Sequence, residues 1–210
     1  YRVSSVKANV PVPAMPVPDA VRTATAPPVR VESTKLADGV WLLGGGTHNS
    51  MLVEFKDFVA VVEAPQNEER SLAVIAEAQK LVPNKVIQYV VNTHHHFDHI
   101  GGLRTYLAMG STIVTHESNK DYYLDILFHP GDWHMKPDIF AKFNPMYMIS
   151  RRPAPIDVVG KKYVISDGVR EMQVLQVRDV AYELGDPSYA QGPHSADMLM
   201  VYLPKEKILF

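Results

Sequence analysis

The stretch Thr93-His94-His95-His96-Phe97-Asp98-His99-Ile100-Gly101-Gly102 decides the fold of this chain. It contains four histidines and one aspartate, and it comes directly after the apolar run Val86–Val91. In an extended segment the side chains of residues i and i+2 project to the same side, so the imidazoles of His94 and His96 can reach one ion. The sequence therefore predicts a metal site in this loop.

Asp98 and His99 follow where the chain is expected to turn into a helix, so they can project differently and bind a second ion nearby. Gly101 and Gly102 let the backbone turn and approach its neighbours closely. The donors are imidazole nitrogen and carboxylate oxygen without sulfur, because the chain has no cysteine. This set suits zinc, and also iron or manganese. An isolated histidine is usually a surface residue, but this density after a buried strand favours a metal site.

The segments around this stretch read as alternating strands and helices. Strands are predicted at Val40–Leu43, Ser50–Phe55, Phe58–Val62, Val86–Val91 and Thr112–Thr115, and helices from about Glu68 to Leu81 and from about Gly102 to Met109. The strand–helix–strand order implies parallel pairing with a right-handed crossover. Parallel sheets place functional groups just outside the carboxyl ends of their strands. An α/β fold would therefore put the histidine-rich loop where a site is expected.

The two ends of the chain differ from this pattern. Residues 1–31 carry Pro11, Pro13, Pro16, Pro18, Pro27 and Pro28, which predict an extended arm or linker with neither helix nor central strand. Residues 32–210 are expected to form one domain. Met198–Leu203 reads as a strand, and Ile208–Phe210 begins another just where the sequence stops. Such a stub has nothing to pair with, so we expect the domain to be incomplete at its C-terminus.

From about Val40 to its end, the chain resembles the metallo-β-lactamase superfamily. The family motif His-x-His-x-Asp-His is matched by His94, His96, Asp98 and His99. The resemblance implies an αββα four-layer sandwich of two similar halves. It also implies that His94 and His96 bind one metal together with a distant third histidine. Asp98 and His99 would bind a second metal, together with a bridging aspartate and a further histidine.

The distant third ligand is expected in a loop before a strand. His194, in Gly192–Asp197 directly before Met198, fits that position. The bridging aspartate and the last histidine of the family would come after Phe210. The resemblance therefore implies that the ligands of the first metal are complete in this chain, while those of the second metal are not.

The function that the resemblance implies is that of a zinc-dependent hydrolase. Two zinc ions are expected in the full-length protein, with iron or manganese as alternatives. Metal-activated hydroxide would attack an ester, thioester, lactone or β-lactam bond, and Asp98 would hold the second metal and orient the nucleophile. Two other functions remain open: a mononuclear iron oxidoreductase similar to persulfide dioxygenases, and a non-catalytic metal-binding module.

Several further residues have two readings each. Glu63 ends a strand and would either orient a ligand imidazole or be a solvated acid. His48 and His116 could line a pocket, although structural or solvated roles fit each better. His95 lies between two expected ligands and should point away from the metal. Residues 121–147 are rich in aromatic residues and methionine and would either cover the site as a lid, implying a partly apolar substrate, or pack their own apolar face.

Composition limits the class of partner. The chain has 210 residues with 21 Lys and Arg against 23 Asp and Glu, for a net charge of −2. This balance gives no basic surface for nucleic acid, and no apolar run is long enough to cross a bilayer. A small-molecule substrate is the expected partner. The cellular compartment and the oligomeric state are left open by the sequence.

Overall fold

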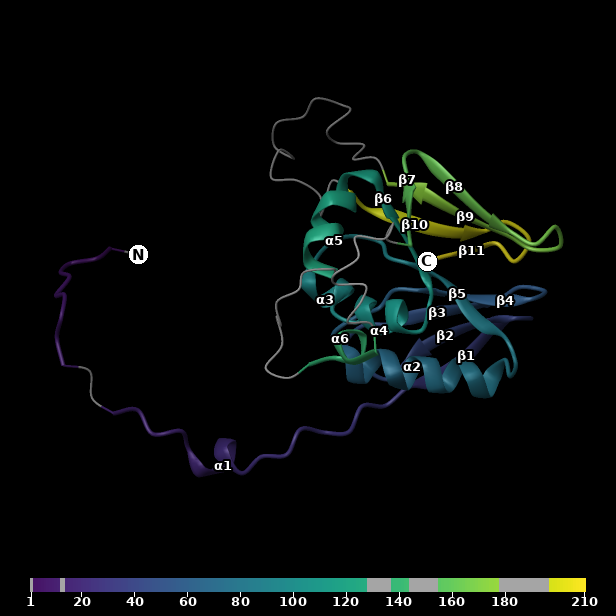
Figure 1. Ribbon diagram of the computed structural model, residues 1–210. Coiled ribbons are helices and arrows are strands. Elements are labelled where there is room, and N and C mark those ends of the chain that lie inside the picture. Colours follow the sequence, from purple (N-terminus) through teal and green to yellow (C-terminus); the bar gives the residue numbers. More distant parts are fainter. Residues whose placement is uncertain (1, 12–13, 128–136, 144–154, 178–196) are drawn as a thin grey trace.

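The computed structural model describes residues 2–11, 14–127, 137–143, 155–177 and 197–210. These residues form three stacked layers: helices, a seven-stranded sheet and a four-stranded sheet (Figure 1). The N-terminal arm runs away from the layers. Among the described residues, no helix is both long enough and apolar enough to cross a membrane.

The first sheet is built in chain order. Its strands are β1 (Glu32–Ala37), β2 (Val40–Gly44), β3 (Ser50–Glu54), β4 (Phe58–Val62), β5 (Val86–Val91), β6 (Thr112–His116) and β7 (Ile156–Val159). Strands β1 to β4 pair antiparallel, and β4 to β7 pair parallel. The parallel pairing predicted for the strand–helix–strand segments is confirmed for β4, β5 and β6.

The helices lie on one face of this sheet. They are α2 (Glu68–Leu81), α3 (Phe97–Ile100), α4 (Leu103–Ala108), α5 (Lys120–Leu127) and α6 (Ile139–Phe143), with a 3₁₀ turn at Glu117–Asn119. Helix α2 has the predicted bounds because both ends are marked in the sequence. The Asn67 side chain caps it by accepting from the Arg70 backbone N–H at 2.9 Å, and Pro83 follows its last turn.

The second sheet consists of β8 (Lys162–Ser166), β9 (Glu171–Gln176), β10 (Leu199–Leu203) and β11 (Ile208–Leu209), all antiparallel. The expectation that the last residues have nothing to pair with was wrong. Strand β11 pairs with β10, and Phe210 exchanges two backbone hydrogen bonds of 2.9 Å with Val201. The polar turn 204–207 folds the chain back on itself, so that β10 and β11 form a hairpin.

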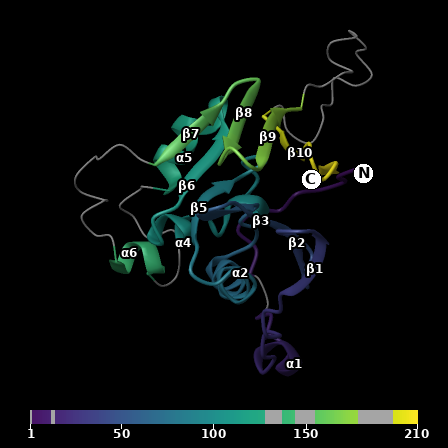
Figure 2. The same ribbon diagram turned by 90° about the vertical axis from the view of Figure 1, so that its right-hand side faces the viewer.

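Alternation along the strands divides the core in two. In β4, Val59 and Val61 pack against the helices, while Ala60 and Val62 pack against the second sheet. Figure 2 shows this arrangement, with β8, β9 and β10 on one side of the first sheet and α2 on the other. Helices α2, α3, α4, α5 and α6 each bury apolar side chains in the helical-side core. None of these described helices therefore covers the outer face of the second sheet.

The described residues of the arm are exposed, as expected for an extended arm, except Val31, which packs partly buried against the helical-side core. One detail of that expectation was wrong, because a single helical turn, α1 (Asp19–Arg22), begins after Pro18. Proline at a helix start costs nothing, since its missing N–H would have no partner within the helix. The turn buries no side chain, and the Arg22 guanidinium pairs with the Asp19 carboxylate on its surface.

Candidate metal centre

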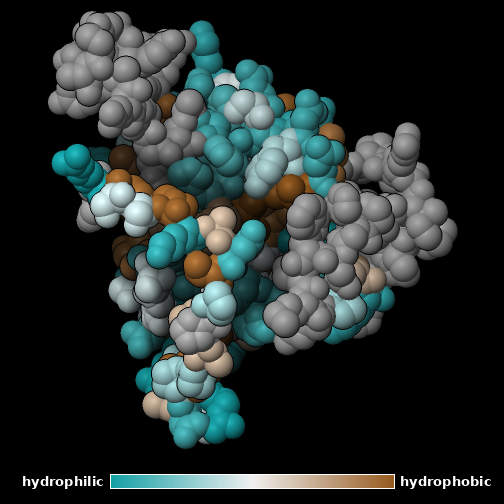
Figure 3. Space-filling model, turned by 90° about the vertical axis from the view of Figure 1, so that its left-hand side faces the viewer, coloured by the Kyte–Doolittle hydropathy of each residue, from teal (hydrophilic) through white to brown (hydrophobic). Residues whose placement is uncertain are grey.

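The histidine-rich loop lies at the carboxyl ends of the parallel strands, as predicted. The chain leaves β5 at Val91, runs through residues 92–96 and enters α3 at Phe97. At the same edge, β4 ends and passes into Glu63. Figure 3 views this end of the molecule, where hydrophobic and hydrophilic side chains meet in the middle of the face. The topology therefore brings residues from the β4, β5 and β2–β3 segments together.

Three metal-capable side chains converge here: His48, Asp98 and His99. One ligand atom from each lies within 4.8 Å of the other two. The Asp98 Oδ2 atom lies 3.1 Å from His48 Nε2 and 3.9 Å from His99 Nε2. Asp98 and His99 were predicted to share a metal. His48 was given a structural or solvated role by the sequence, and the structure places it in this group instead.

Glu63 stands behind this group. Its side chain is buried, and its Oε2 atom contacts His99 Nδ1 while its Oε1 atom accepts the Thr93 backbone N–H at 2.7 Å. A buried carboxylate on one ring nitrogen fixes the tautomer and directs the other nitrogen outward. Of the two readings for Glu63, the solvated acid is excluded by its burial. The contact with His99 is the one expected if Glu63 orients a ligand imidazole.

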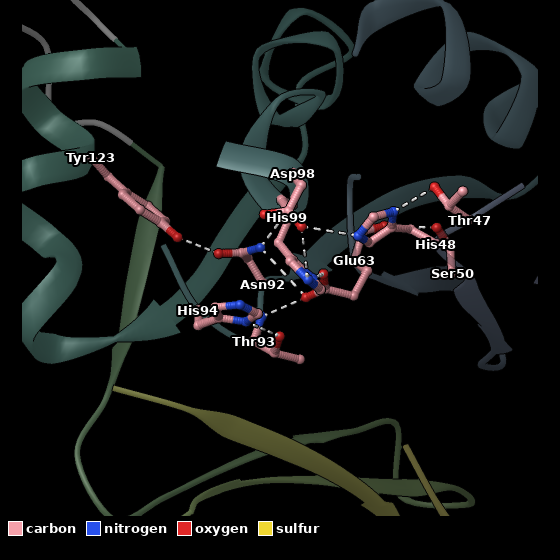
Figure 4. A network of polar contacts seen from close by, with 10 residues as sticks. All are labelled: Thr47, His48, Ser50, Glu63, Asn92, Thr93, His94, Asp98, His99 and Tyr123. Carbon is pink, nitrogen blue, oxygen red and sulfur yellow. Dashed lines mark hydrogen bonds and ion pairs between the residues drawn. The ribbon is translucent and has the colours of Figure 1, made fainter. Parts of the chain in front are cut away.

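A buried polar network extends from Glu63 across the sheet edge (Figure 4). Tyr123 on α5 donates its hydroxyl to Asn92 Oδ1, and the Asn92 amide donates to the His99 carbonyl at 3.1 Å. Thr93 Oγ1 lies 2.9 Å from His94 Nδ1. Asn92 and Thr93, which flank the expected ligands, are thus held by hydrogen bonds to Glu63 at the end of β4, to His99 on α3 and to Tyr123 on α5.

The other predicted ligands are only partly described. The rings of His94 and His96 lie 4.8 Å apart between centroids, and His94 lies 4.0 Å from His99. His94 is buried. The predicted third ligand of this metal, His194, lies outside the described residues. The convergence of His94, His96 and His194 on one ion therefore stays a prediction.

The neighbouring histidines have other contacts. His95 Nδ1 lies 3.0 Å from Asp197 Oδ2, and its ring meets Tyr122 edge to face. It is absent from the group of three, as its predicted orientation away from the metal requires. His116 ends β6, and its Nδ1 accepts the Ser118 backbone N–H at 3.3 Å. His116 thus caps a turn, which agrees with the structural role that the sequence favoured.

The aromatic stretch 121–147 is described only in part. Tyr123 and Phe140 are buried in the helical-side core, as expected for a segment that packs its own apolar face. Tyr122 is exposed beside His95. Residues 128–136 and 144–147 lie outside the described residues, so the lid stays a prediction.

A cleft of about 410 Å³ opens beside the group. It is lined by Thr47, His48, Asn49, Glu63, Thr93, His94, His99, Met198 and Phe210. The imidazoles and the Glu63 carboxylate form its polar side, while Met198 and Phe210 supply apolar surface. Phe97, next to Asp98 in the chain, is 83% exposed at the same end of the molecule.

The charges in the group stabilise one another. The pKa of His99 is raised mainly by its hydrogen bond to Glu63. Burial lowers this pKa, but the charges of Glu63 and Asp98 raise it further. Burial alone would raise the pKa of Asp98, but hydrogen bonds from its own backbone and from His48, with the charge of His99, outweigh it and lower that pKa. Asp98 is therefore a carboxylate at neutral pH.

The chemistry of the donor set fits a divalent metal. The group offers two imidazole nitrogens and one carboxylate oxygen, with a buried carboxylate behind one imidazole. These are the ligand types of zinc sites and of non-haem iron sites. All three side chains are partly exposed, and His48 and His99 line the cleft, so an ion and a substrate can both reach the group.

Comparison with known proteins gives the same fold. The family model described as metallo-beta-lactamase superfamily matches residues 43–210. Solved structures similar to this chain include a metallo-beta-lactamase from Pontibacter korlensis, with TM-score 0.59 and 20% identity over 86% of this chain and 70% of that one. The DIM-1 metallo-beta-lactamase follows with TM-score 0.57 and 18% identity over 86% of this chain and 68% of that one. The search of curated proteins found no match.

Proposed function

The chain belongs to the metallo-β-lactamase superfamily, and from that premise we propose that it is a metal-dependent hydrolase. Its substrate class is an ester, thioester, lactone or β-lactam. The observation that carries the proposal is the convergence of His48, Asp98 and His99 within 4.8 Å at the edge of a cleft. Zinc is the proposed metal, with iron or manganese as alternatives that the donor set also suits.

The proposed ligands of the metals are His94, His96 and His194 for one ion, with Asp98 and His99 for the other. When bound, such an ion acts as a Lewis acid and activates water at neutral pH. The Asp98 carboxylate would hold and orient the attacking water through its oxygen atoms. Glu63 would keep the His99 ring in place by holding its Nδ1 atom.

The proposed substrate is a small molecule with an apolar part. Met198 and Phe210 support this proposal, because they bring apolar surface to the cleft that His94 and His99 also line. A substrate bound there would place its carbonyl group near the imidazoles and its apolar part against the methionine and phenylalanine side chains.

The test begins with the metal-free protein. Zinc, iron(II) and manganese(II) are added separately, and turnover is measured on aryl esters, a thioester, a lactone and a chromogenic β-lactam. We expect zinc-dependent hydrolysis of at least one class, and its loss in Asp98→Asn. Absence of metal binding in the wild-type protein would overturn the proposal. Stoichiometric iron without zinc in the purified protein, with no hydrolysis, would favour the oxidoreductase.

A further inference from the structure

We propose that His48 is a direct metal ligand, completing a three-residue site with Asp98 and His99. This inference rests on the proposed function, since it assumes that the chain binds a metal. His48 lies outside the histidine-rich loop, in the segment between β2 and β3, fifty residues before Asp98. Its position in the group is therefore a product of folding and not of the motif.

The distances support coordination. A tetrahedral zinc ion with bonds of about 2.0–2.1 Å separates its ligand atoms by roughly 3.3 Å. The two separations from Asp98 Oδ2, 3.1 Å to His48 Nε2 and 3.9 Å to His99 Nε2, lie on either side of that value. All three ligand atoms lie within 4.8 Å of one another, which is close enough for them to surround one ion.

The orientation of both rings also supports coordination. The Nδ1 atom of His48 lies 2.9 Å from Thr47 Oγ1, and that of His99 contacts Glu63 Oε2. Each ring thus uses one nitrogen on a protein group and turns Nε2 toward Asp98. This is the arrangement in which metal-binding histidines are usually found, with one nitrogen held and the other facing the ion.

The loop that carries His48 is held in place by a buried cation. Arg70, 1% exposed, donates through Nη2 to the carbonyls of Leu43 at 3.0 Å and Gly44 at 2.9 Å, with a weaker contact of 3.5 Å to the His48 carbonyl. The Gln66 side chain also donates to the hydroxyl oxygen of Thr47, the residue before His48, at 2.9 Å. A ligand must be preorganised to bind strongly, and these contacts supply that preorganisation.

The alternative role for His48 is to donate a hydrogen bond to Asp98 while the ion sits elsewhere. Glutamine distinguishes the two roles, because it can replace a hydrogen-bond donor but not an imidazole ligand. His48→Gln keeps an N–H donor for Asp98 but removes the imidazole, whereas His48→Ala removes both. Loss of a partner outside the first coordination sphere typically costs about 10–100-fold in metal affinity. Loss of a ligand is expected to cost more.

The experiment measures zinc affinity by chelator competition and zinc content by elemental analysis in wild-type protein, His48→Gln and His48→Ala. His95→Gln is the matched control, because His95 pairs with Asp197 and is not in the group. We expect one zinc equivalent to weaken by more than about 100-fold in both His48 variants, and to be unchanged in the control. Near-wild-type affinity in His48→Gln would overturn the inference.

A second measurement needs no variant. Zinc is titrated into wild-type protein labelled with ¹⁵N, and the ring nitrogens of His48 are followed by NMR. Direct coordination predicts a large shift of the Nε2 resonance that saturates with one zinc equivalent. If wild-type protein binds no zinc, the proposed function fails as well. If it binds zinc while the His48 Nε2 resonance stays in place, only this inference fails.

Discussion

Glu63 occupies a backbone conformation that few side chains tolerate. Its φ of 72° lies in the left-handed region, which costs a non-glycine residue on the order of 1–3 kcal/mol. The neighbouring contacts hold it there: the Glu63 N–H donates to the Val91 carbonyl at 2.8 Å, and the Ser50 hydroxyl donates to the Glu63 carbonyl at 3.0 Å. Such strain is commonly found at functional sites, and here it belongs to the residue that contacts His99.

Replacing Glu63 with glutamine tests this role at the residue scale. Glu63→Gln keeps the side-chain shape but loses the charge that contacts His99 Nδ1. We expect the pKa of His99 in the metal-free protein to fall toward its ordinary value, and zinc affinity to drop by about 10–100-fold. NMR titration of the His99 ring and chelator competition measure the two effects. Glu77→Gln on the α2 surface is the control, and an equal effect there would contradict the assignment.

Single residues also show where the sequence was informative and where it was not. Asp98 and His99 could be predicted to lie together because they are adjacent in a recognisable motif. His48 could not, because its partner is fifty residues away and a lone histidine in a glycine-rich loop carries no pattern. Only the pairing of β2, β3 and β4 brings that loop to the carboxyl end of β4.

At the scale of elements, the passage from the loop into α4 depends on close packing. A Cβ atom on Gly101 would lie 2.0 Å from the Gln66 carbonyl oxygen, a backbone atom that cannot move aside without disturbing the start of α2. The sequence predicted a close approach and a sharp turn at this glycine pair. The close approach is confirmed, but neither glycine has a positive φ, so steric room and not backbone freedom is the requirement.

Gly101→Ala should therefore destabilise the protein. Overpacking of this kind typically costs about 1–3 kcal/mol, which for a chain of this size lowers the melting temperature by roughly 2–4 °C per kcal/mol. Thermal unfolding of the metal-free protein measures the change. Gly160→Ala is the control, because its added Cβ would meet its nearest neighbour at an ordinary 3.5 Å. A melting temperature equal to wild type would show that the loop can shift freely.

The elements themselves were unequally predictable. Strands β3 and β4 are mostly buried, β5 is mostly apolar and ends in the buried Val90 and Val91, and helix α2 has a clear cap and stop, so the bounds of these elements could be read from the sequence. Strand β1 (Glu32–Ala37) was missed because it is an edge strand whose residues are almost all exposed. Strand β8 (Lys162–Ser166) was missed for a similar reason, because it is an edge strand with only one buried residue.

On the scale of the whole molecule, the two sheets are tied together at the end opposite the site. Arg170, in the turn before β9, donates through Nη1 to the carbonyls of Gly39, in the turn between β1 and β2, and of Glu54 on β3. Asp167, in the same turn, accepts the Lys56 backbone N–H at 2.5 Å. These contacts complement the apolar core between the sheets, because they fix the position of the β8–β9 hairpin.

Asp167 makes this tie sensitive to acid. The Arg170 backbone N–H is the main cause that lowers the pKa of Asp167 from 3.8 to about 2; burial opposes it, and the N–H groups of Lys56 and Val169 add to it. A lowered pKa in the folded state stabilises the protein fully above pH 3.8, and this contribution is lost as the pH falls toward 2.

Asp167→Asn should therefore lower the free energy of unfolding by about 1 kcal/mol at pH 7. The difference from wild type should shrink as the pH falls from about 4 to about 2, where the wild-type carboxyl also becomes neutral. Urea unfolding across this pH range measures it, with the exposed Asp57→Asn as control. A difference that stays constant with pH would mean that the charge of Asp167 is unimportant.

The order of strands in the first sheet has a consequence for synthesis on the ribosome. Each strand from β2 to β7 pairs with the strand that precedes it in the chain, so the sheet can grow as the polypeptide emerges. Its inner face, including Met51, Val62 and Val91, stays open to water until the second sheet arrives to cover it. At about 5–20 residues per second this interval lasts seconds. We expect nascent chains stalled after β7 to be cleaved faster in pulse proteolysis than chains stalled with β10 and β11 outside the exit tunnel. Equal protection of the two lengths would show that the first sheet folds stably without the second sheet packed on it.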